Sequence, residues 1–338
     1  MKANNKSNAC KSPNRKPQQK KEIIMSQNYK TLCKLPEVFS RSPILSQVRV
    51  KDKFAMATDM DTWITQPCDI EDGLYFYQAF EKNIFIKSSM VFEDFPDSFI
   101  MGEKQAEVYI DKNEMAAFNW VKSAASNEES RYYLNGVCFS GLGQCVATDG
   151  ARLHMFDVRR NDLNLKRDYI IPNKACRLIS KLFEDYDCQT TRIIFHEKGF
   201  VAVIGEATIK GKLIDGTFPN YTRIQNEFDK ADYKETSFDV DALIVHMPEI
   251  KIITKIEGIR EMHLMLGEET ALLKSNGTIP GDRFYDIKFP CPVPIKCNAR
   301  YLSELCGGRA FYSNPLEPVK FVNDKYSPTR TAYLMPVR

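Results

Sequence analysis

The tripeptide Ala-Thr-Asp occurs twice in the chain, each time at the end of a strand-like run, and a Phe-Pro pair follows each copy. The first copy is 57–59, with Phe95 and Pro96 downstream; the second is 147–149, with Phe218 and Pro219 downstream. One tripeptide match carries little weight, but two landmarks in the same order indicate a duplicated unit. The first copy is shorter between its landmarks, so it predicts a trimmed version of the second.

The 338 residues suggest two or three domains with real cores. Short runs in which apolar and polar residues alternate, separated by Gly, Asp or Asn, predict many strands. Four segments favour helices, and the tail repeats the strand and helix order of the middle. Strand-rich chains with a few helices between groups of strands are α+β proteins. The expected helices are 111–126, 173–186, 298–305 and, more weakly, 240–246. The expected divisions are a disordered basic arm over 1–24 and units over 25–105 (shortened), 106–228 and 229–338.

Composition excludes several classes of protein. No apolar run reaches about 18 residues, so no membrane span and no membrane partner are expected. Ten cysteines are scattered without a Cys-x-x-Cys pair, which argues against zinc and favours reduced core thiols in a cytoplasmic protein. A net charge of +3 is too small to indicate nucleic acid by itself, although it allows a local basic surface.

The sequence gives little support for an enzymatic function. The stretch 205–212 is similar to a phosphate-binding loop, but it has one residue too many between its glycines, and Leu213 stands where Ser or Thr is needed. Asp59 and Asp61 could hold a metal ion, yet no further carboxylates support them and Asp59 suits a turn. The four histidines form no triad-like pattern. We therefore predict no catalytic residue, no metal site and no cofactor.

Two stretches are candidates for contact with nucleic acid. In the helix expected over 173–186, Lys174, Arg177 and Lys181 share one face beside an apolar stripe. Arg131, Tyr132 and Tyr133 precede a strand, where exposed aromatic rings beside an arginine suit stacking on an unpaired base. An ordinary solvated helix face and packing at a strand edge are the alternatives. The arm over 1–24 is either a tail that touches DNA or, as we favour, a solvated leader.

Several motifs resemble, in order and spacing, the bacterial DNA polymerase III β subunit family, the sliding clamps. The match is strongest over 106–228, looser over 229–338 and weak over 40–105, and the short first unit is more similar to a phage or mobile-element clamp than to a cellular one. The motifs are RYYLNGVCF (131–139), VATDGARL (146–153), YIIPNKACRLISKLF (169–183), GKLIDGTFPNYTRI (211–224) and YLMPVR (333–338).

The resemblance implies a ring of two subunits, each with three similar α+β domains, strands outside and helices lining the hole. It implies a non-enzymatic processivity factor that encircles double-stranded DNA in the cytoplasm, or in the host cytoplasm if phage-encoded. Expected partners are DNA polymerase, an ATP-driven clamp loader and a second copy in a homodimer. It assigns the basic helix face to the hole lining, with Arg41 and Lys122 as weaker DNA-facing candidates. The alternative is a clamp-derived interaction module that does not encircle DNA, which the trimmed first unit favours.

The resemblance also explains the second Ala-Thr-Asp copy, because in the family this turn forms one wall of a peptide-binding pocket. Clustered Met, Pro and aliphatic residues with an arginine rim suit a short apolar peptide; plain core is the alternative for 335–337. Ala151 stands where the family usually has His, and Arg338 replaces a final apolar residue, so we expect an altered peptide preference. The pocket residues implied are Leu134, Thr148, Gly150, Arg152, Leu153, Pro219, Arg223, Ile224, Tyr301, Pro318, Leu334, Met335, Pro336 and Val337.

Overall fold

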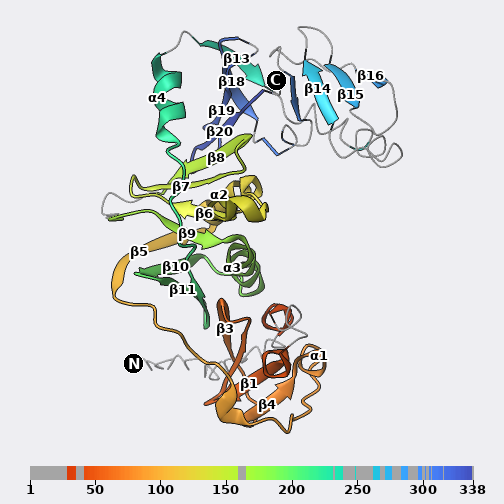
Figure 1. The fold of residues 1–338 in the computed structure, drawn as a ribbon, viewed down its shortest axis with the longest axis vertical. Coiled ribbons are helices and arrows are strands. Elements are labelled where there is room, and N and C mark those ends of the chain that lie inside the picture. Colours follow the sequence, from red (N-terminus) through yellow and green to blue (C-terminus); the bar gives the residue numbers. More distant parts are fainter. Residues whose placement is uncertain are drawn as a thin grey trace, which may run out of the picture.

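The computed structural model covers most of the chain between Tyr29 and Pro336, and its described parts form a crescent (Figure 1). None of the helices in these parts has the length and apolar character that crossing a membrane requires. The described residues are 29–35, 42–158, 165–230, 233–238, 248, 262–266, 271–275, 283–287, 296–298, 301, 304–305, 307–314 and 316–336. Four predicted features lie outside them: Arg41, Val337, the arm over 1–24 and the weaker helix over 240–246.

The middle of the chain builds one pattern twice: a strand, a helix and a meander of three strands. The first half consists of β5 (Lys104–Asp111), α2 (Lys112–Val121), β6 (Gly136–Phe139), β7 (Gln144–Thr148) and β8 (Arg152–Asp157). The second half consists of β9 (Tyr169–Pro172), α3 (Asn173–Asp185), β10 (Thr190–His196), β11 (Gly199–Ile204) and β12 (Ala207–Lys212). The halves exchange their first strands, because β5 pairs with β10 and β9 pairs with β6.

Local sequence explains where the two helices begin. Asp111 accepts hydrogen bonds from the backbone amides of Asn113 and Glu114, and the Glu114 side chain accepts one from the backbone amide of Asp111. This capping box satisfies amides that have no partner inside α2. Pro172 precedes α3, where a missing N–H costs no hydrogen bond.

The predicted helices agree with the structure to different degrees. The helix expected over 173–186 is confirmed by α3, whose buried face includes Leu178, Ile179 and Leu182. The helix expected over 111–126 is too long, since α2 ends at Val121 and the chain tightens into the 3-10 turn η5 (Lys122–Ala124).

Antiparallel sheets join the units to one another, and only a few helices lie between groups of strands in the described residues. This arrangement confirms the α+β prediction. The first unit contributes β1 (Gln47–Lys51), β2 (Phe54–Thr58), β3 (Thr62–Pro67) and β4 (Gly73–Phe76), followed by the short helix α1 (Tyr77–Phe80). The last unit contributes β13 (Lys234–Phe238), β14 (Met262–Leu266), β15 (Ala271–Ser275), β16 (Arg283–Ile287), β17 (Lys296–Asn298), β18 (Gly308–Tyr312), β19 (Val319–Asn323) and β20 (Arg330–Leu334). One eight-stranded sheet runs β4-β1-β2-β3-β12-β11-β10-β5, another runs β13-β18-β19-β20-β8-β7-β6-β9, and β16-β15-β14-β17 form a third.

The first unit holds only half of the repeated pattern. Strands β1 to β3 form its first meander, and β4 pairs with β1 as β9 pairs with β6. After β4 and α1, the chain between Glu81 and Glu103, all of it described, contains the 3-10 turn η4 (Phe92–Asp94) and no second meander. In its described part the unit is therefore trimmed by the loss of the three-stranded second meander. The boundaries expected at 105/106 and 228/229 stay predictions.

Helical segments also occur where the sequence did not indicate them. Two strand-like alternating runs, 44–50 and 131–139, each begin with a 3-10 turn before the strand: η3 (Pro43–Ser46) and η6 (Glu129–Leu134). The helix α4 (Thr222–Lys230) was not expected. Its apolar residues are few, so the sequence reads as a loop.

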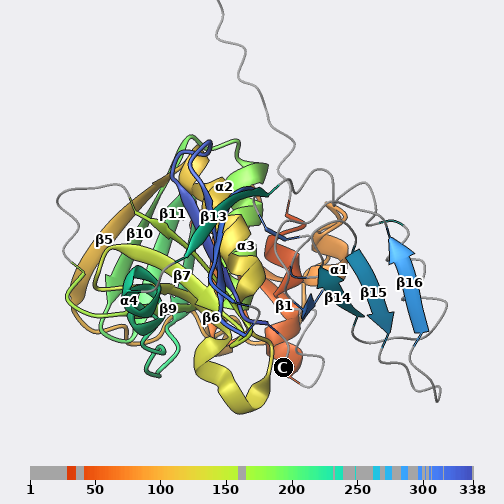
Figure 2. The ribbon, with the colours of Figure 1, turned by 90° about the horizontal axis from the view of Figure 1, so that it is seen from above.

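The first and middle units share one apolar core. Leu32 and Phe80 of the first unit belong to the same buried cluster as Phe118, Phe139 and Phe195 of the middle unit. Burial of this shared surface favours a fixed contact between the two units. Helices α2 and α3 lie side by side on the inner side of the crescent (Figures 1 and 2).

Candidate partner-binding and DNA-facing sites

The turn between β7 and β8 is held by its own side chains. Thr148 Oγ1 donates to the carbonyl of Arg152 (2.6 Å) and accepts from the amide of Gly150 (3.0 Å). Asp149 Oδ1 accepts from the amides of Ala151 (3.0 Å) and Arg152 (3.1 Å). Gly150 has φ of +92°, a conformation that favours glycine. Thr148 and Asp149 thus fix the shape of the turn.

The first Ala-Thr-Asp copy builds the same turn between β2 and β3. Thr58 Oγ1 donates to the carbonyl of Thr62 (2.9 Å) and accepts from the amide of Met60 (2.9 Å). Asp59 Oδ1 accepts from the amides of Asp61 (3.0 Å) and Thr62 (2.6 Å). Every hydrogen bond has its counterpart in the second copy, so the sequence repeat is a structural repeat, and Asp59 is a turn residue as expected.

Arg152 lies in the joint between the middle and last units. Its side chain is 4% exposed and forms ion pairs with Asp149 (3.1 Å) and with Glu304. The guanidinium also donates to the carbonyl of Ser123 and stacks over the ring of Tyr301, 4.4 Å from its centre. The arginine that was expected at the rim of a pocket is therefore bound within the protein on several sides.

His154 lies fully buried next to this joint. Its ring stacks on Trp120, with the ring centres 4.3 Å apart, and its Nδ1 lies 3.2 Å from the carbonyl oxygen of Trp120. Burial, with the neighbouring charge of Arg152, lowers the pKa of His154 from 6.5 to about 3. The imidazole is neutral at physiological pH.

Several of the described residues predicted for the peptide pocket come together in the fold, as Leu134, Leu153 and Ile224 do in one apolar cluster. Leu153 on β8 lies next to β20, whose Leu334 pairs with Arg152, and the amide of Met335 donates to the carbonyl of Ala151 (2.8 Å). Leu134, Leu153 and Leu334 are at most 3% exposed and can form only the floor. The more accessible members are Pro219, Arg223, Ile224, Tyr301, Pro318, Met335 and Pro336.

The predicted stacking loop adjoins the turn. A Cβ placed on Gly150 would lie 2.6 Å from Nη1 of Arg131, which is ion-paired with Glu128 at 2.7 Å. Tyr132 is 54% exposed, whereas Tyr133 is half-buried beside Gly216. Tyr132 is thus the ring of this loop that is most available to a stacked base.

A basic hollow lies between η1 (Leu32–Lys34), α2 and α3, on the inner side of the crescent. It has a volume of about 450 Å³. Burial lowers the pKa of Lys122, which donates to Asn119 Oδ1 (2.7 Å) and Ser180 Oγ (2.9 Å). The hollow is lined by Lys34, Asn119, Lys122, Arg177, Ser180, Lys181 and Glu184. Four cations thus face one carboxylate.

The predicted DNA-facing stripe divides in the structure. Arg177 and Lys181 line the hollow, and Lys181 also pairs with Asp185 (3.1 Å). Lys174 pairs with the buried carboxylate of Asp59 and so ties α3 to the first unit. The helical period placed all three cations on one face but could not show which of them has a partner in another unit.

Sequence reasoning missed two residues of these sites. Lys34 lies in a short 3-10 turn that carries no periodic signal, and only the fold brings it to α3. Glu304 was part of a predicted helix, with nothing to indicate its pairing with Arg152.

Comparison with known proteins agrees with this geometry. The family model of the DNA polymerase III beta subunit central domain matches residues 110–220. The beta sliding clamp of Caulobacter vibrioides is 26% identical over 257 residues, which are 69% of this chain and 66% of that protein. The beta sliding clamp of Chlamydia muridarum is 38% identical over 112 residues, 32% of this chain and 30% of that protein. In sequence, the chain therefore spans less than two thirds of these relatives.

Solved structures share the fold over more of the chain. A Caulobacter crescentus pol III beta structure superposes with a TM-score of 0.70 at 21% identity, covering 91% of this chain and 97% of that one. A Bartonella birtlesii sliding clamp bound to griselimycin gives a TM-score of 0.72 at 22% identity, covering 93% and 98%. The family model thus matches only the middle unit, while the fold likeness covers nearly the whole chain.

Proposed function

The chain belongs to the DNA polymerase III β subunit family, the sliding clamps, and we propose that it is a processivity factor that closes around double-stranded DNA. In this role it performs no covalent chemistry. It holds a DNA polymerase at the template by topology, as a homodimeric ring in the cytoplasm. Its contacts with DNA are therefore loose and independent of sequence.

The observation that carries this proposal is the basic hollow on the inner side of the crescent. Lys34, Lys122, Arg177 and Lys181 come from η1, the turn after α2, and α3. Lysine and arginine side chains that neutralise phosphates supply affinity without reading bases. Helix α3, which carries Arg177 and Lys181, lies on the inner side of the crescent (Figure 1), toward the space that the crescent encloses.

The second part of the proposal is that the surface around 148–153 takes short apolar segments of partners, including the polymerase. Met335, Pro336 and Ile224 are partly accessible above a floor of buried leucines. Such a pairing of apolar anchors with a closed floor suits a peptide hot spot. Loading on DNA requires a separate ATP-driven loader, since the sequence carries no nucleotide-binding motif.

Retention on DNA of different topology tests the ring. Loaded protein should stay on a nicked circular plasmid during gel filtration at high salt and should leave after the plasmid is cut once. Binding to phosphates alone would weaken equally on both forms as salt rises. Equal loss from circular and linear DNA would contradict encirclement.

The missing second meander favours one other candidate, an interaction module that does not encircle DNA. At each observed joint, the last strand of one unit's first meander pairs with the last strand of the next unit's second meander. Strand β3 of the first unit pairs with β12 of the middle unit, and β8 of the middle unit pairs with β20 of the last unit. The described part of the first unit has no second meander to offer β16 of another copy. Light scattering across a dilution series separates the candidates: a mass near twice 38.9 kDa supports the ring, and a monomer supports the module.

A further inference from the structure

The joint between the first and middle units repeats the joint that carries the proposed peptide pocket. Thr62 pairs with Gly211 across β3 and β12, as Arg152 pairs with Leu334 across β8 and β20. In the next position the amide of Lys212 donates to the carbonyl of Asp61 at 2.9 Å. The corresponding bond in the other joint, from Met335 to Ala151, is 2.8 Å. Residues after β12 therefore stand where residues after β20 stand in the peptide pocket.

The Phe-Pro landmarks complete the correspondence. Trp63 occupies the position that Leu153 holds in the other joint, one residue beyond the turn, and its Nε1 donates to the carbonyl of Pro96 at 2.9 Å. Pro96 corresponds in sequence to Pro219 of the peptide pocket. Turn, strand pair and Phe-Pro segment thus recur together.

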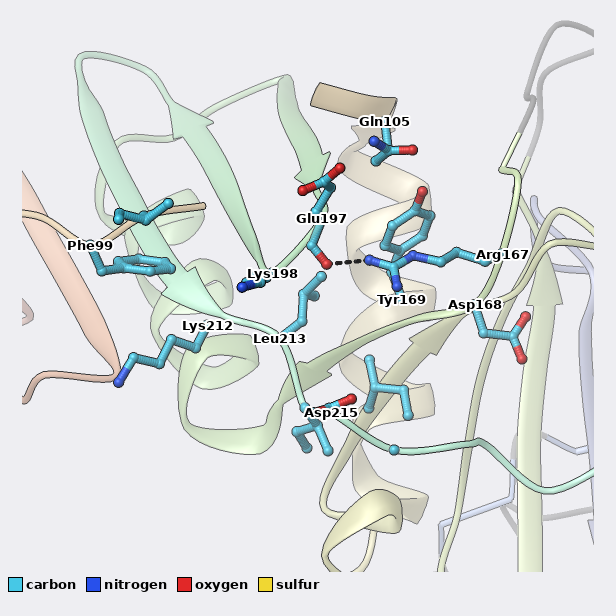
Figure 3. Close-up of a pocket in the computed structure, with 14 residues that line it drawn as sticks. Phe99, Gln105, Arg167, Asp168, Tyr169, Glu197, Lys198, Lys212, Leu213 and Asp215 are labelled. Carbon is cyan, nitrogen blue, oxygen red and sulfur yellow. Dashed lines mark hydrogen bonds between the residues drawn. The ribbon is translucent and has the colours of Figure 1, made fainter. Parts of the chain in front are cut away.

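A cavity of about 860 Å³ lies beside this joint, which is ample room for several side chains of a peptide (Figure 3). The joint reaches it through Lys212 of β12 and through Phe99, whereas Trp63, Pro96 and the turn at 58–62 do not line it. Phe99, Lys212 and Leu213 line one side of it, and Arg167, Tyr169 and Asp168 line the other (Figure 3). The full lining is Phe99, Ile100, Gln105, Arg167, Asp168, Tyr169, Ile170, Glu197, Lys198, Lys212, Leu213, Ile214, Asp215 and Gly216.

The apolar part of the lining is prepared for a ligand rather than closed on itself. Phe99 is fixed, because its ring stacks on Trp63 with ring centres 4.8 Å apart. The next residue, Ile100, is 87% exposed. Leu213 and Ile214 are half-buried beside it, with their amides bonded to the carbonyls of Lys198 and Ile170 at 3.1 and 3.0 Å. A rigid floor with an exposed aliphatic side chain is the surface that an apolar anchor covers.

The charges of the rim favour a peptide over nucleic acid. The cations Arg167, Lys198 and Lys212 are matched by the carboxylates Asp168, Glu197 and Asp215. Lys212 pairs with Asp61 at 2.9 Å, and Arg167 donates to the backbone carbonyl of Glu197. A balanced rim gives no electrostatic attraction to phosphate, whereas it can pair with the mixed charges that flank an apolar segment.

We propose that this cavity is a second docking groove, which takes a short extended apolar segment of a partner protein. The inference rests on the proposed function, because it takes the corresponding pocket at 148–153 to be a peptide site. Each chain then holds two partner segments at once, one at each joint, and two partners can share one clamp.

The test uses a fluorescein-labelled hexapeptide, Gly-Leu-Ser-Leu-Phe-Gly, titrated against the full-length chain by anisotropy and calorimetry. Wild type should bind two peptides per chain. Ile100→Asp should weaken one of the two sites at least tenfold, because it places a charge on the exposed apolar anchor. Val91→Asp is the matched control: Val91 is 57% exposed, lies in the same unit and is absent from the cavity lining. It should leave both sites unchanged.

The double variant Leu153→Ala with Met335→Ala separates this inference from the proposed function. In one outcome, wild type binds a single peptide, at a site that the double variant abolishes and Ile100→Asp leaves intact. That result would overturn the second groove and leave the pocket at 148–153 standing. A single site lost only in Ile100→Asp would keep the groove and remove the pocket at 148–153. No saturable binding up to about 1 mM (about −4 kcal/mol) would overturn the groove.

A photo-crosslinking amino acid at position 100 gives a second readout. It should capture the peptide, while the same group at position 91 should not. Displacement of the peptide by a 20-base-pair duplex from wild type but not from Ile100→Asp would assign the cavity to nucleic acid instead and overturn the proposal.

Discussion

The guanidinium of Arg152, the first residue of β8, pairs with the carboxylate of Glu304, which lies 152 positions further along the chain. The same guanidinium pairs with Asp149 at 3.1 Å and stacks over Tyr301. The Ala-Thr-Asp turn is therefore part of the joint between two units as well as a wall of the proposed pocket.

Arg152→Ala should destabilise the protein by about 2 kcal/mol, because it removes the buried guanidinium that binds the half-buried carboxylates of Asp149 and Glu304. Urea unfolding followed by circular dichroism measures the change. Arg309→Ala is the control: its side chain is 46% exposed and pairs with Asp324 at 3.1 Å. Exposed pairs contribute at most about 1 kcal/mol, so equal losses from the two variants would contradict this account of Arg152.

Gly150→Ala should cost about 1–2 kcal/mol, because Gly150 has φ of +92° and side-chain-bearing residues are strained there. The added Cβ would also lie 2.6 Å from Nη1 of Arg131 and push that side chain aside. Thermal or urea unfolding measures the cost. Gly141→Ala is the control, because its Cβ would have the carbonyl oxygen of Leu165 as its nearest neighbour at 3.3 Å and would need only a small adjustment. A smaller loss from Gly150→Ala than from Gly141→Ala would contradict the strained turn.

Acid should weaken the fold through His154. The folded pKa is lowered to about 3, whereas the unfolded imidazole titrates near 6.5. Below pH 6.5 the unfolded state therefore binds a proton that the folded state refuses, and stability falls as pH falls, until the folded group also titrates near pH 3. Between pH 8 and pH 5 this contribution is about 2 kcal/mol.

The comparison of wild type with His154→Leu isolates this effect from the carboxylates, which titrate in both proteins. The free energy of unfolding of wild type should drop by about 2 kcal/mol more than that of the variant between pH 8 and pH 5. Parallel curves for the two proteins would show that His154 does not carry the predicted acid sensitivity.

Much of this fold could be predicted from the sequence, because its signals are local. Thr148 and Asp149 mark a turn by their side-chain chemistry, Pro172 marks the start of α3, and the apolar period gives its buried face. What could not be predicted depends on contacts between units. Lys174 and Arg177 are both basic residues on one face of the predicted helix, yet of the two it is Lys174 that pairs with the carboxylate of Asp59. The cavity beside Ile100 likewise depends on segments far apart in the chain, because residues near 100, 168, 197 and 213 line it together.

Salt dependence of DNA binding tests the basic hollow. The double variant Lys34→Ala with Arg177→Ala should lower the slope of log K against log salt by about 2, since each lost phosphate contact removes about 0.9 from it. The measurement is anisotropy of a labelled 30-base-pair duplex between 50 and 200 mM salt. The exposed residues Lys51 and Lys325 lie outside the hollow, and the double variant Lys51→Ala with Lys325→Ala should keep the wild-type slope. Identical slopes for both double variants would contradict a DNA-facing hollow.

Truncation of the pocket at 148–153, in the joint between the middle and last units, should weaken the binding of a peptide from the tail of the polymerase. Leu153 is 3% exposed and forms floor, while Met335 is partly accessible. Leu153→Ala with Met335→Ala removes apolar surface from both levels, so the loss should be at least about 1.4 kcal/mol, or tenfold. Calorimetric titration measures it, and unfolding curves of the double variant show whether the fold is intact. If the double variant is folded and binds the peptide with wild-type affinity, the peptide binds elsewhere, because both truncated side chains belong to the predicted pocket.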